Sequence, residues 1–560
     1  MQHTATQAIF EMLERRADEV VGTFHSYRDS GEQVSRLTGR ELYDRSVRLA
    51  GRLTRDGRDR GPVGILCPQT PDYLVAVLGC LAAGRVAVPL HAPGNARSTH
   101  RLGSALADSG AHEVLTVERF RDAVSGATTR GTRVLSVDRE HLGPRPAPAG
   151  TEPDSIAYLQ YTSGSTRDPA GVCVTHANVL AGVRQLSSAF GLTARSRLVS
   201  WLPLYHDMGL VFLLTALLTG APVHVLSPQD FATSPIRWLR LISDHRATHS
   251  VTPNSGLDLC VQRTSEQDRS RLDLRSLRVL VNGSEPVRLS SIRRFTDLFA
   301  ASGFSPAAHT PGYGLAEATL VVSNADPARQ PRSISVDRAA LRAGFVRESD
   351  DRACSVELVS CGTPVMQSAC IVDPDTRQEV GRSRTGEIWV RGPNVCKGYW
   401  RKPDLSRGTF DATRSGGRGD DRGWLRTGDI GFVHDGELFV VDRLKDVIVL
   451  GGQNHYAADI EASVHEHVPS VRRCAAYGVR TSREGGERLV LSIEVGAGQD
   501  VAETTRHIRR VVGSNHEVMV ADVVAVGSGK LPRTSSGKIK RTACRDQYRE
   551  AVSRRTAVSS

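Results

Sequence analysis

Several features that would direct a first interpretation are missing from this chain of 560 residues. Its ten cysteines include no C-x-x-C pair, so a metal cluster or a disulfide framework is not expected, and reduced thiols in a cytoplasmic protein are favoured. Aromatic residues make up only 5%, which argues against stacking platforms for nucleic acid. A Walker loop is also absent, because Ile539 follows Gly537 and Lys538 where Ser or Thr would be required.

Positive charge exceeds negative charge without forming a lysine-rich tail. The chain has 72 lysines and arginines against 61 aspartates and glutamates, a net charge of +11. The basic residues are mostly arginines scattered among acids, as in residues 36–60. This pattern favours a solvated surface, with a basic face for an anionic partner as the alternative, and no nucleic-acid partner is predicted.

Two segments could be taken for a signal peptide or a membrane-spanning helix. Residues 1–19 place Ile9, Met12 and Leu13 at helical spacing among acids, which predicts an amphipathic helix instead of a signal peptide. Residues 208–229 are apolar but contain two prolines and two glycines. They predict a buried helix followed by a short strand, so no membrane insertion is expected.

Strand-like and helical patterns alternate through the first 330 residues. Apolar runs at 63–67, 86–90 and 277–282 alternate with helical segments such as 72–83. This order predicts an α/β fold with mostly parallel sheets flanked by helices. After about residue 330, short β-rich pieces separated by Gly and Pro predict a β-barrel-like subdomain.

A domain boundary is predicted at residues 442–445. It separates an N-terminal body, residues 1–441, from a smaller α+β unit, residues 442–560. In the smaller unit, a helix over 459–466 precedes two apolar strands and a second helix.

A loop rich in Gly, Ser and Thr is the strongest single chemical signal. Residues 161–176 read YTSGSTRDPAGVCVTH, between an apolar strand and a helix. Such a loop exposes backbone N–H groups and hydroxyls that can hold a phosphate. For the segment on its own, an ordinary polar turn is the alternative.

Six further motifs follow in order along the chain. They are WLPLYHDMG (201–209), NGSEP (282–286), GYGLAEAT (312–319), RTGD (426–429), DRLKD (442–446) and LPRTSSGKIK (531–540). Together with the loop, they resemble the adenylate-forming superfamily of acyl-CoA ligases, peptide-synthetase adenylation domains and luciferases. The resemblance covers about residues 40–545.

The wording of the motifs is most similar to the fatty acyl-AMP ligase branch of that superfamily. The segments typical of that branch are LQYTSGST (159–166), LYHDMG (204–209), YGLAEATL (313–320) and NHY (454–456). An extra segment at about residues 333–356 agrees, because in that branch such an insertion is thought to hamper the domain arrangement used for coenzyme A. A neutral surface loop is the alternative for this segment.

The resemblance implies a two-step reaction. A fatty acid is activated by ATP and Mg²⁺ to acyl-AMP with release of pyrophosphate, and the acyl group then passes to the phosphopantetheine thiol of a separate acyl carrier protein. The carboxylate nucleophile is already an anion, so catalysis needs positioning and charge stabilisation more than a general base. The alternatives are an acyl-CoA ligase and, as a non-enzyme, a degenerate nucleotide-binding protein.

The matching motifs also imply roles for individual residues. Lys538 would reach the carboxylate and the α-phosphate, Glu317 would hold Mg²⁺, and His206 would face the fatty carboxylate. Lys445 would be the hinge on which a mobile C-terminal domain delivers Lys538. The residues implied to bind nucleotide or substrate are Thr162, Ser163, Gly164, Ser165, Thr166, Gly283, Ser284, Glu285, Gly312, Tyr313 (stacked on adenine), Gly314, Asp429 (on the ribose), Arg443 and Asn254.

The sequence departs from the branch near the expected site. Ala170 stands where relatives usually have Lys or Arg, which removes one expected phosphate contact, and residues 253–256 replace a bulkier phrase near the expected acyl pocket. His245 and His249 lie four residues apart, but without an H-E-x-x-H motif or a third ligand they do not predict zinc.

Overall fold

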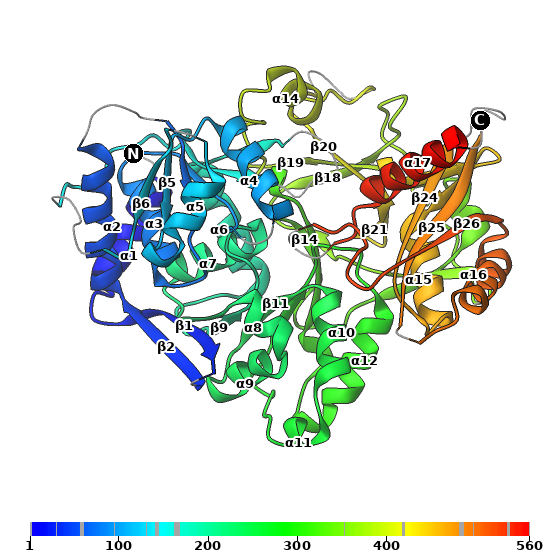
Figure 1. Cartoon of the computed structure of the whole chain (residues 1–560), viewed down its shortest axis with the longest axis horizontal. Coiled ribbons are helices and arrows are strands. Elements are labelled where there is room, and N and C mark those ends of the chain that lie inside the picture. Colours follow the sequence, from blue (N-terminus) through cyan, green and yellow to red (C-terminus); the bar gives the residue numbers. More distant parts are fainter. Residues whose placement is uncertain are drawn as a thin grey trace.

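A computed structural model gives the architecture of the chain. It describes residues 3–29, 31–55, 61–93, 96–129, 131–139, 145–161, 169–351, 353–416, 421–480, 486–496, 498–534 and 538–558. Figure 1 shows a large α/β body with a smaller unit, formed by the end of the chain, on its right. Two mostly parallel sheets in the body confirm the α/β fold predicted from the alternating pattern.

A nine-stranded sheet runs through the centre of the body. Its order is β17-β14-β13-β12-β11-β9-β10-β1-β2, and the strands from β13 to β1 are parallel. The strands are β1 (Val20–Arg28), β2 (Gly31–Thr38), β9 (Leu198–Ser200), β10 (Val223–Leu226), β11 (His249–Thr252), β12 (Val279–Asn282), β13 (His309–Gly314), β14 (Val321–Asn324) and β17 (Thr363–Pro364). Because parallel strands end at one edge, the loops after β11, β12 and β13 lie together.

A second sheet of six strands has the order β6-β5-β3-β4-β7-β8. Its strands are β3 (Val63–Ile65), β4 (Ala87–Pro89), β5 (Glu113–Thr116), β6 (Arg133–Ser136), β7 (Ile156–Tyr161) and β8 (Gly171–Thr175). Strands β7 and β8 pair antiparallel and flank the Gly/Ser/Thr loop. Residues 162–168 of that loop, with the predicted contacts of Thr162 to Thr166, lie outside the described residues.

Helices cover both sheets. In the body they are α1 (Ala5–Arg15), α2 (Gly39–Thr54), α3 (Pro71–Ala82), α4 (Ala96–Ser109), α5 (Arg121–Ala127), α6 (His176–Phe190), α7 (Asp207–Thr219), α8 (Pro228–Thr233), α9 (Ile236–Asp244), α10 (Asn254–Arg263), α11 (Glu266–Arg269), α12 (Leu289–Phe299), α13 (Arg338–Arg342) and α14 (Pro403–Phe410). Helix α1 is the predicted N-terminal helix, with a capping box at Thr4 and Gln7 that satisfies its first N–H groups.

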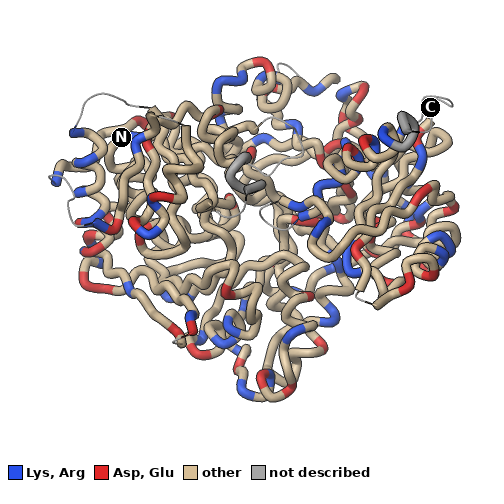
Figure 2. The backbone as a smooth tube through the Cα atoms, viewed as in Figure 1, with Lys and Arg blue, Asp and Glu red and all other residues tan. Residues whose placement is uncertain are grey.

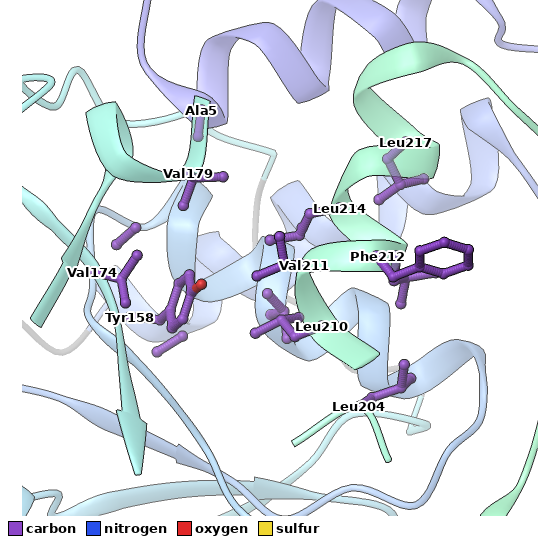
Figure 3. Close-up of a cluster of buried hydrophobic side chains, with 14 of the residues drawn as sticks. Ala5, Tyr158, Val174, Val179, Leu204, Leu210, Val211, Phe212, Leu214 and Leu217 are labelled. Atoms are coloured by element: carbon purple, nitrogen blue, oxygen red, sulfur yellow. The ribbon is translucent and has the colours of Figure 1, made fainter. Parts of the chain in front are cut away.

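Helix α7 is buried on every side, as predicted from its apolar sequence. Positions 208–217 are all buried. Figure 3 shows Leu210 and Val211 among the side chains of Tyr158 and Val174 from β7 and β8. Each such buried side chain contributes roughly 1.5–3 kcal/mol. The helix ends at Gly220, whose φ of 71° suits glycine. In the described part of the chain, no helix is both long and apolar enough for a membrane crossing.

The β-rich region after residue 330 consists of two open sheets. One contains β18 (Ser368–Val372), β19 (Gly386–Arg391), β20 (Leu425–His434) and β21 (Glu437–Arg443), and the other pairs β15 (Ser333–Asp337) with β16 (Ser355–Val359). Side chains from β15, β16, β20 and β21 share one core. The described residues here therefore form two open sheets around a common core, in place of the β-barrel-like subdomain expected from the sequence.

The C-terminal unit has its own sheet and core. Its elements are β22 (Val447–Leu450), β23 (Gln453–Tyr456), α15 (Ala457–His467), β24 (Val471–Arg480), β25 (Glu487–Val495), α16 (Val501–His516), β26 (Val520–Val526) and α17 (Arg541–Val558). Helices α15 and α16 share a core with β24 and β25. Basic and acidic residues are interspersed over most of the molecule, as Figure 2 shows.

Candidate active site

A cavity of about 2520 Å³ is lined by both the body and the C-terminal unit. The loops after β11, β12 and β13 border it from the body, and residues of α15, Thr534 and residues 538–541 border it from the other unit. The described residues that the motifs implicate all line it, namely His206, Asn254, Gly283, Ser284, Glu285, Gly312, Tyr313, Gly314, Glu317, Asp429, Arg443, Lys445 and Lys538.

Lys538 brings a positive charge from the C-terminal unit to the acids of the body. Its backbone N–H donates to Thr534 Oγ1 at 3.0 Å, and its carbonyl accepts from the Thr534 N–H at 2.8 Å. These two bonds fix the backbone of Lys538 against Thr534. Burial lowers the pKa of the ammonium group, while the negative charges of Asp207 and Glu285 oppose that shift.

His206 and Asp207 form a pair at the start of α7. His206 is the residue that precedes the helix, and its Nδ1 contacts Asp207 Oδ1. Burial raises the pKa of Asp207, but His206, Lys538 and the Met208 N–H outweigh it and hold this pKa below its ordinary value. Asp207 is therefore a carboxylate that fixes His206 and attracts Lys538.

Glu317 lies on a short 3₁₀ turn, Ala316–Ala318, after β13. The hydroxyl of Tyr399 donates to Glu317 Oε1 at 2.8 Å, which holds the carboxylate in one orientation. Burial raises the pKa of Glu317. A carboxylate held at the wall of a cavity suits Mg²⁺ that is also bound by phosphate oxygens.

Tyr313, Asp429 and Arg443 make a connected polar group. The Tyr313 hydroxyl donates to Asp429 Oδ2 at 2.7 Å, and Arg443 Nε lies 3.3 Å from Asp429 Oδ1. Asp429 and Arg443 face each other across β20 and β21. A carboxylate has about four acceptor positions, so Asp429 retains capacity for further donors.

The backbone between β12 and β14 is closely packed. A Cβ atom on Gly314 would lie 1.7 Å from the Leu320 carbonyl oxygen, so only glycine fits there. Ser284 has a φ of 71°, an unfavourable value for a residue with a side chain. Strain of this kind is typical of functional loops, and here it borders the cavity.

Asn254 holds the loop after β12 in place through hydrogen bonds. It is 1% exposed, and its Nδ2 donates to the Pro286 carbonyl at 2.7 Å. Its Oδ1 accepts from Asn282 Nδ2 and from the Arg288 N–H. Both polar atoms of the Asn254 amide therefore bond to other groups of the protein. The contact of Asn254 with substrate stays a prediction.

One side of the cavity is apolar. It is lined by side chains of α6, α7, β11 and β12, namely Leu186, Phe190, Phe212, Val251 and Val281. They belong to one buried hydrophobic cluster, and His206, directly before α7, lines the same cavity. The arrangement can bind a molecule with a polar head and a hydrocarbon tail.

Beside the predicted phosphate loop, Lys402 Nζ donates to the Pro169 carbonyl and lies 3.2 Å from Asp108 Oδ1. Ala170 itself lines the cavity. A cation from a distant segment therefore lies next to the position at which the sequence lacks one.

Two residues of the site were not assigned from sequence. Asp207 stands inside a recognised motif, directly after His206. An acidic residue at the start of a helix was the signal by which the sequence could have identified it as a site residue. Tyr399 is 82 residues from Glu317, and no local pattern connects them.

Comparison with known proteins places these features in context. A model of the AMP-binding enzyme family matches residues 13–400, and a model described as Disco-interacting protein 2-like, AMP domain, matches residues 445–556. The chain is 40% identical to a protein named long-chain-fatty-acid–AMP ligase FadD26 from Mycobacterium marinum, over 96% of each chain. It is also 40% identical to a 4-hydroxyphenylalkanoate adenylyltransferase of that organism, over 92% of this chain and 86% of the other.

Solved structures give the same picture. The chain is similar to a structure described in a study of fatty acyl-adenylate ligases from E. coli and L. pneumophila, with a TM-score of 0.86 and 31% identity over 98% of each chain. A fatty acyl-adenylate ligase from L. pneumophila in complex with acyl adenylate and pyrophosphate matches with a TM-score of 0.76 and 31% identity, over 97% of this chain and 96% of the other.

Proposed function

Because the chain belongs to the AMP-binding enzyme family, and to its fatty acyl-AMP ligase branch, we propose that it converts a long-chain fatty acid and ATP into acyl-AMP and pyrophosphate. It then transfers the acyl group to the phosphopantetheine thiol of a separate acyl carrier protein. The observation that carries this proposal is the position of Lys538, which lies in the cavity with Asp207 and Glu285.

In the first step, a carboxylate oxygen of the fatty acid attacks the α-phosphorus of ATP, and the bond from that phosphorus to pyrophosphate breaks. The nucleophile and the electrophile are both anionic, so the ammonium group of Lys538 is proposed to lie between them. His206, held by Asp207, is proposed to donate from Nε2 to the fatty carboxylate.

The nucleotide is proposed to bind across the ends of β12, β13 and β20. Asp429 accepts the ribose hydroxyls beside Arg443, and Tyr313 lines the adenine pocket. Glu317 holds Mg²⁺, which offsets charge on the ATP phosphates when it is bound. Tyr399 keeps the Glu317 carboxylate aimed for that role.

We predict that Val251→Phe shortens the preferred acyl chain. Val251 is 1% exposed and lines the apolar side of the cavity, so a ring at this position occupies space for the end of the tail. Losing the fit of even one methylene is worth roughly 1–3 kcal/mol, so kcat/KM for the longest substrate should fall at least about tenfold relative to shorter ones. Rates with a series of even-numbered fatty acids test this. Val251→Ala should leave long-chain preference intact, and an unchanged profile in Val251→Phe would place the tail elsewhere.

The pH dependence of kcat/KM should have two limbs. Glu317 acts as a carboxylate, and burial raises its pKa, so activity falls as pH drops through that value. Lys538 acts as an ammonium, and burial lowers its pKa, so activity is present below that pKa and is lost as pH rises through it. Lys538→Arg should move the alkaline limb to higher pH, because arginine keeps its proton. An alkaline limb at the same pH in that variant would assign it to another group.

The acceptor is proposed to be a carrier protein because the segment at residues 333–356 ties the two units together. Arg338 makes two bonds to Asp459, 2.9 and 3.2 Å long, with both side chains 12% exposed. Arg342 contacts Glu517 at 2.8 Å. These bonds favour the arrangement with Lys538 in the cavity over one that admits a thiol.

We propose a boundary at residues 442–445 with Lys445 as the hinge. Asp442 lies on β21, before the Lys445 hinge; it accepts from the Ala458 N–H at 2.9 Å and lies 3.5 Å from Arg541, so these bonds join the two sides of the hinge. Rotation of the C-terminal domain would break them together with the Arg338 pair. A carrier protein has a docking surface whose binding offsets that loss, whereas coenzyme A is small.

Arg338→Gln combined with Arg342→Gln should raise acyl-CoA formation by roughly tenfold. A hydrogen bond to a charged group is worth about 1.5–3 kcal/mol, so its loss shifts the balance toward the rotated state by that factor. Mass spectrometry of products with coenzyme A measures the change. The control is Arg347→Gln, since Arg347 pairs with Asp337 inside the same segment. No rise above that control would show that the segment does not restrain rotation.

One experiment tests the proposed acceptor directly. The purified protein is incubated with ATP, Mg²⁺ and fatty acid, and acyl products are compared with coenzyme A and with a holo carrier protein. The proposal predicts rapid acylation of the carrier and little acyl-CoA, and the opposite result would favour an acyl-CoA ligase.

The exposed arginines of α16, Arg506, Arg509 and Arg510, offer an anionic carrier a docking surface. The ten free cysteines, nine of them buried, support a cytoplasmic location.

A further inference from the structure

Three histidines from distant parts of the chain meet at one end of the nine-stranded sheet. His25 lies on β1, His224 on β10 and His245 directly after α9. Their ligand nitrogens lie within 4.8 Å of one another. This cluster is at the β10-β1-β2 end of the sheet, at the lower left of Figure 1, whereas the active-site cavity borders β11, β12 and β13.

Two of the rings meet through their nitrogens, and two are stacked. His25 Nε2 lies 3.0 Å from His224 Nδ1, and the rings of His224 and His245 stack with centroids 3.8 Å apart. Strand register explains the first contact. Thr23 pairs with His224, so His25, two residues further, points to the same face of the sheet.

A carboxylate orients the most buried ring. Glu32 Oε1 lies 2.8 Å from His25 Nδ1 and also accepts from the Tyr27 hydroxyl at 2.9 Å. A proton on Nδ1 donated to Glu32 leaves the Nε2 lone pair of His25 directed at His224 Nδ1. Metal-binding histidines typically donate their second nitrogen to a carboxylate in this way.

Charged side chains of both signs surround the cluster. Arg36 and Arg197 add positive potential at His224, while Asp244 and Glu32 add negative potential at His245. His25 is 4% exposed, so its ring is held in place by packing.

We propose that His25, His224 and His245 form a Zn²⁺ site that joins β1, β10 and the end of α9, with Glu32 orienting His25. Three imidazoles and one water complete a tetrahedral ion, in which ligand atoms lie about 3.3 Å apart. His25 Nε2 and His224 Nδ1 lie 3.0 Å apart, close to that spacing, and the ligand nitrogens of all three residues lie within 4.8 Å. Binding requires the His245 ring, stacked on His224, to rotate so that one of its nitrogens points at the ion. His249, the partner considered from sequence, bonds instead to the Phe190 carbonyl at 2.9 Å.

Zinc binding by the untagged, full-length protein after removal of metal by a chelator tests this site. We expect one Zn²⁺ per chain and a higher Tm with zinc, since a ligand of the folded state stabilises it. The affinity for Zn²⁺ should fall at least about tenfold in His224→Gln, which removes one ligand. It should fall about 10–100-fold in Glu32→Gln, which keeps all three imidazole rings and removes only the carboxylate that orients His25. His507→Gln, on α16, is the control and should bind like the wild type.

Cobalt(II) provides the spectroscopic readout. The wild type should show the strong visible bands of tetrahedral Co²⁺ without a sulfur charge-transfer band, and His224→Gln should lose them. Equal zinc affinity in wild type, His224→Gln and Glu32→Gln would overturn the proposal, as would less than about one-fifth of an equivalent of bound zinc in the wild type. A sulfur band would also overturn it, since Cys354 is the exposed thiol among the ten.

Discussion

Replacing Lys538 with alanine should lower the rate of acyl-AMP formation by 10²-fold or more. The lysine is the positive charge that the C-terminal unit contributes to a cavity shared with Asp207, Glu285 and Asp429. Removing one preorganised donor that acts on developing charge typically costs about 10²–10³ in rate, or about 3–4 kcal/mol. Single-turnover formation of acyl-AMP, followed by mass spectrometry, measures the loss.

The control for that experiment is Lys530→Ala. Lys530 is exposed and lies eight positions before Lys538 in the same unit, so it shares the loss of a charge without contacting the cavity. It should retain nearly the wild-type rate. ATP binding and thermal stability should be similar in both variants. If Lys538→Ala kept more than about a tenth of the wild-type rate, its role in the chemical step would be wrong.

Changing Glu317 to glutamine should lower adenylation by about 10²-fold and weaken the response to Mg²⁺. Glutamine keeps the shape of the side chain and can still accept from Tyr399, but it lacks the charge that the cation requires. The rate is measured over a Mg²⁺ titration, where saturation should require much higher concentrations. Removal of Mg²⁺ by a chelator should abolish the wild-type reaction.

Tyr399→Phe separates the orientation of Glu317 from its charge. It removes one hydrogen bond to a carboxylate, worth about 1.5–3 kcal/mol, so a loss of about tenfold is expected with Mg²⁺ still required. A Mg²⁺ titration of Glu317→Gln that matched the wild type would mean that another group holds the cation.

Much of the architecture follows from sequence because local physics determines it. The apolar run of α7 allowed a buried helix to be predicted, and the alternation of strands and helices predicted the parallel sheets. The motifs NGSEP and GYGLAEAT lie at the carboxyl ends of β12 and β13, and RTGD lies near the start of β20. All three identified residues that do line one cavity. Because neighbouring parallel strands end at one edge of the sheet, the fold brings together what the sequence separates.

Other features depend on contacts that no local pattern encodes. Arg338 and Asp459 are 121 residues apart, and His25 and His224 are 199 residues apart. The spacing of His245 and His249 was not taken to predict zinc, and His249 indeed faces the backbone carbonyl of Phe190, but no local pattern connects His245 with His25 and His224. Long-range pairs of this kind become visible only when the register of the strands is known.

Exchange of labelled pyrophosphate into ATP tests the central claim most directly, because it reports reversible adenylate formation without any acceptor. The wild-type protein with Mg²⁺ should catalyse exchange that depends on a long-chain fatty acid, and Lys538→Ala should reduce it by 10²-fold or more. Three results would contradict the proposed reaction: exchange that does not depend on a fatty acid, exchange that persists in Lys538→Ala, or no exchange with any fatty acid tested.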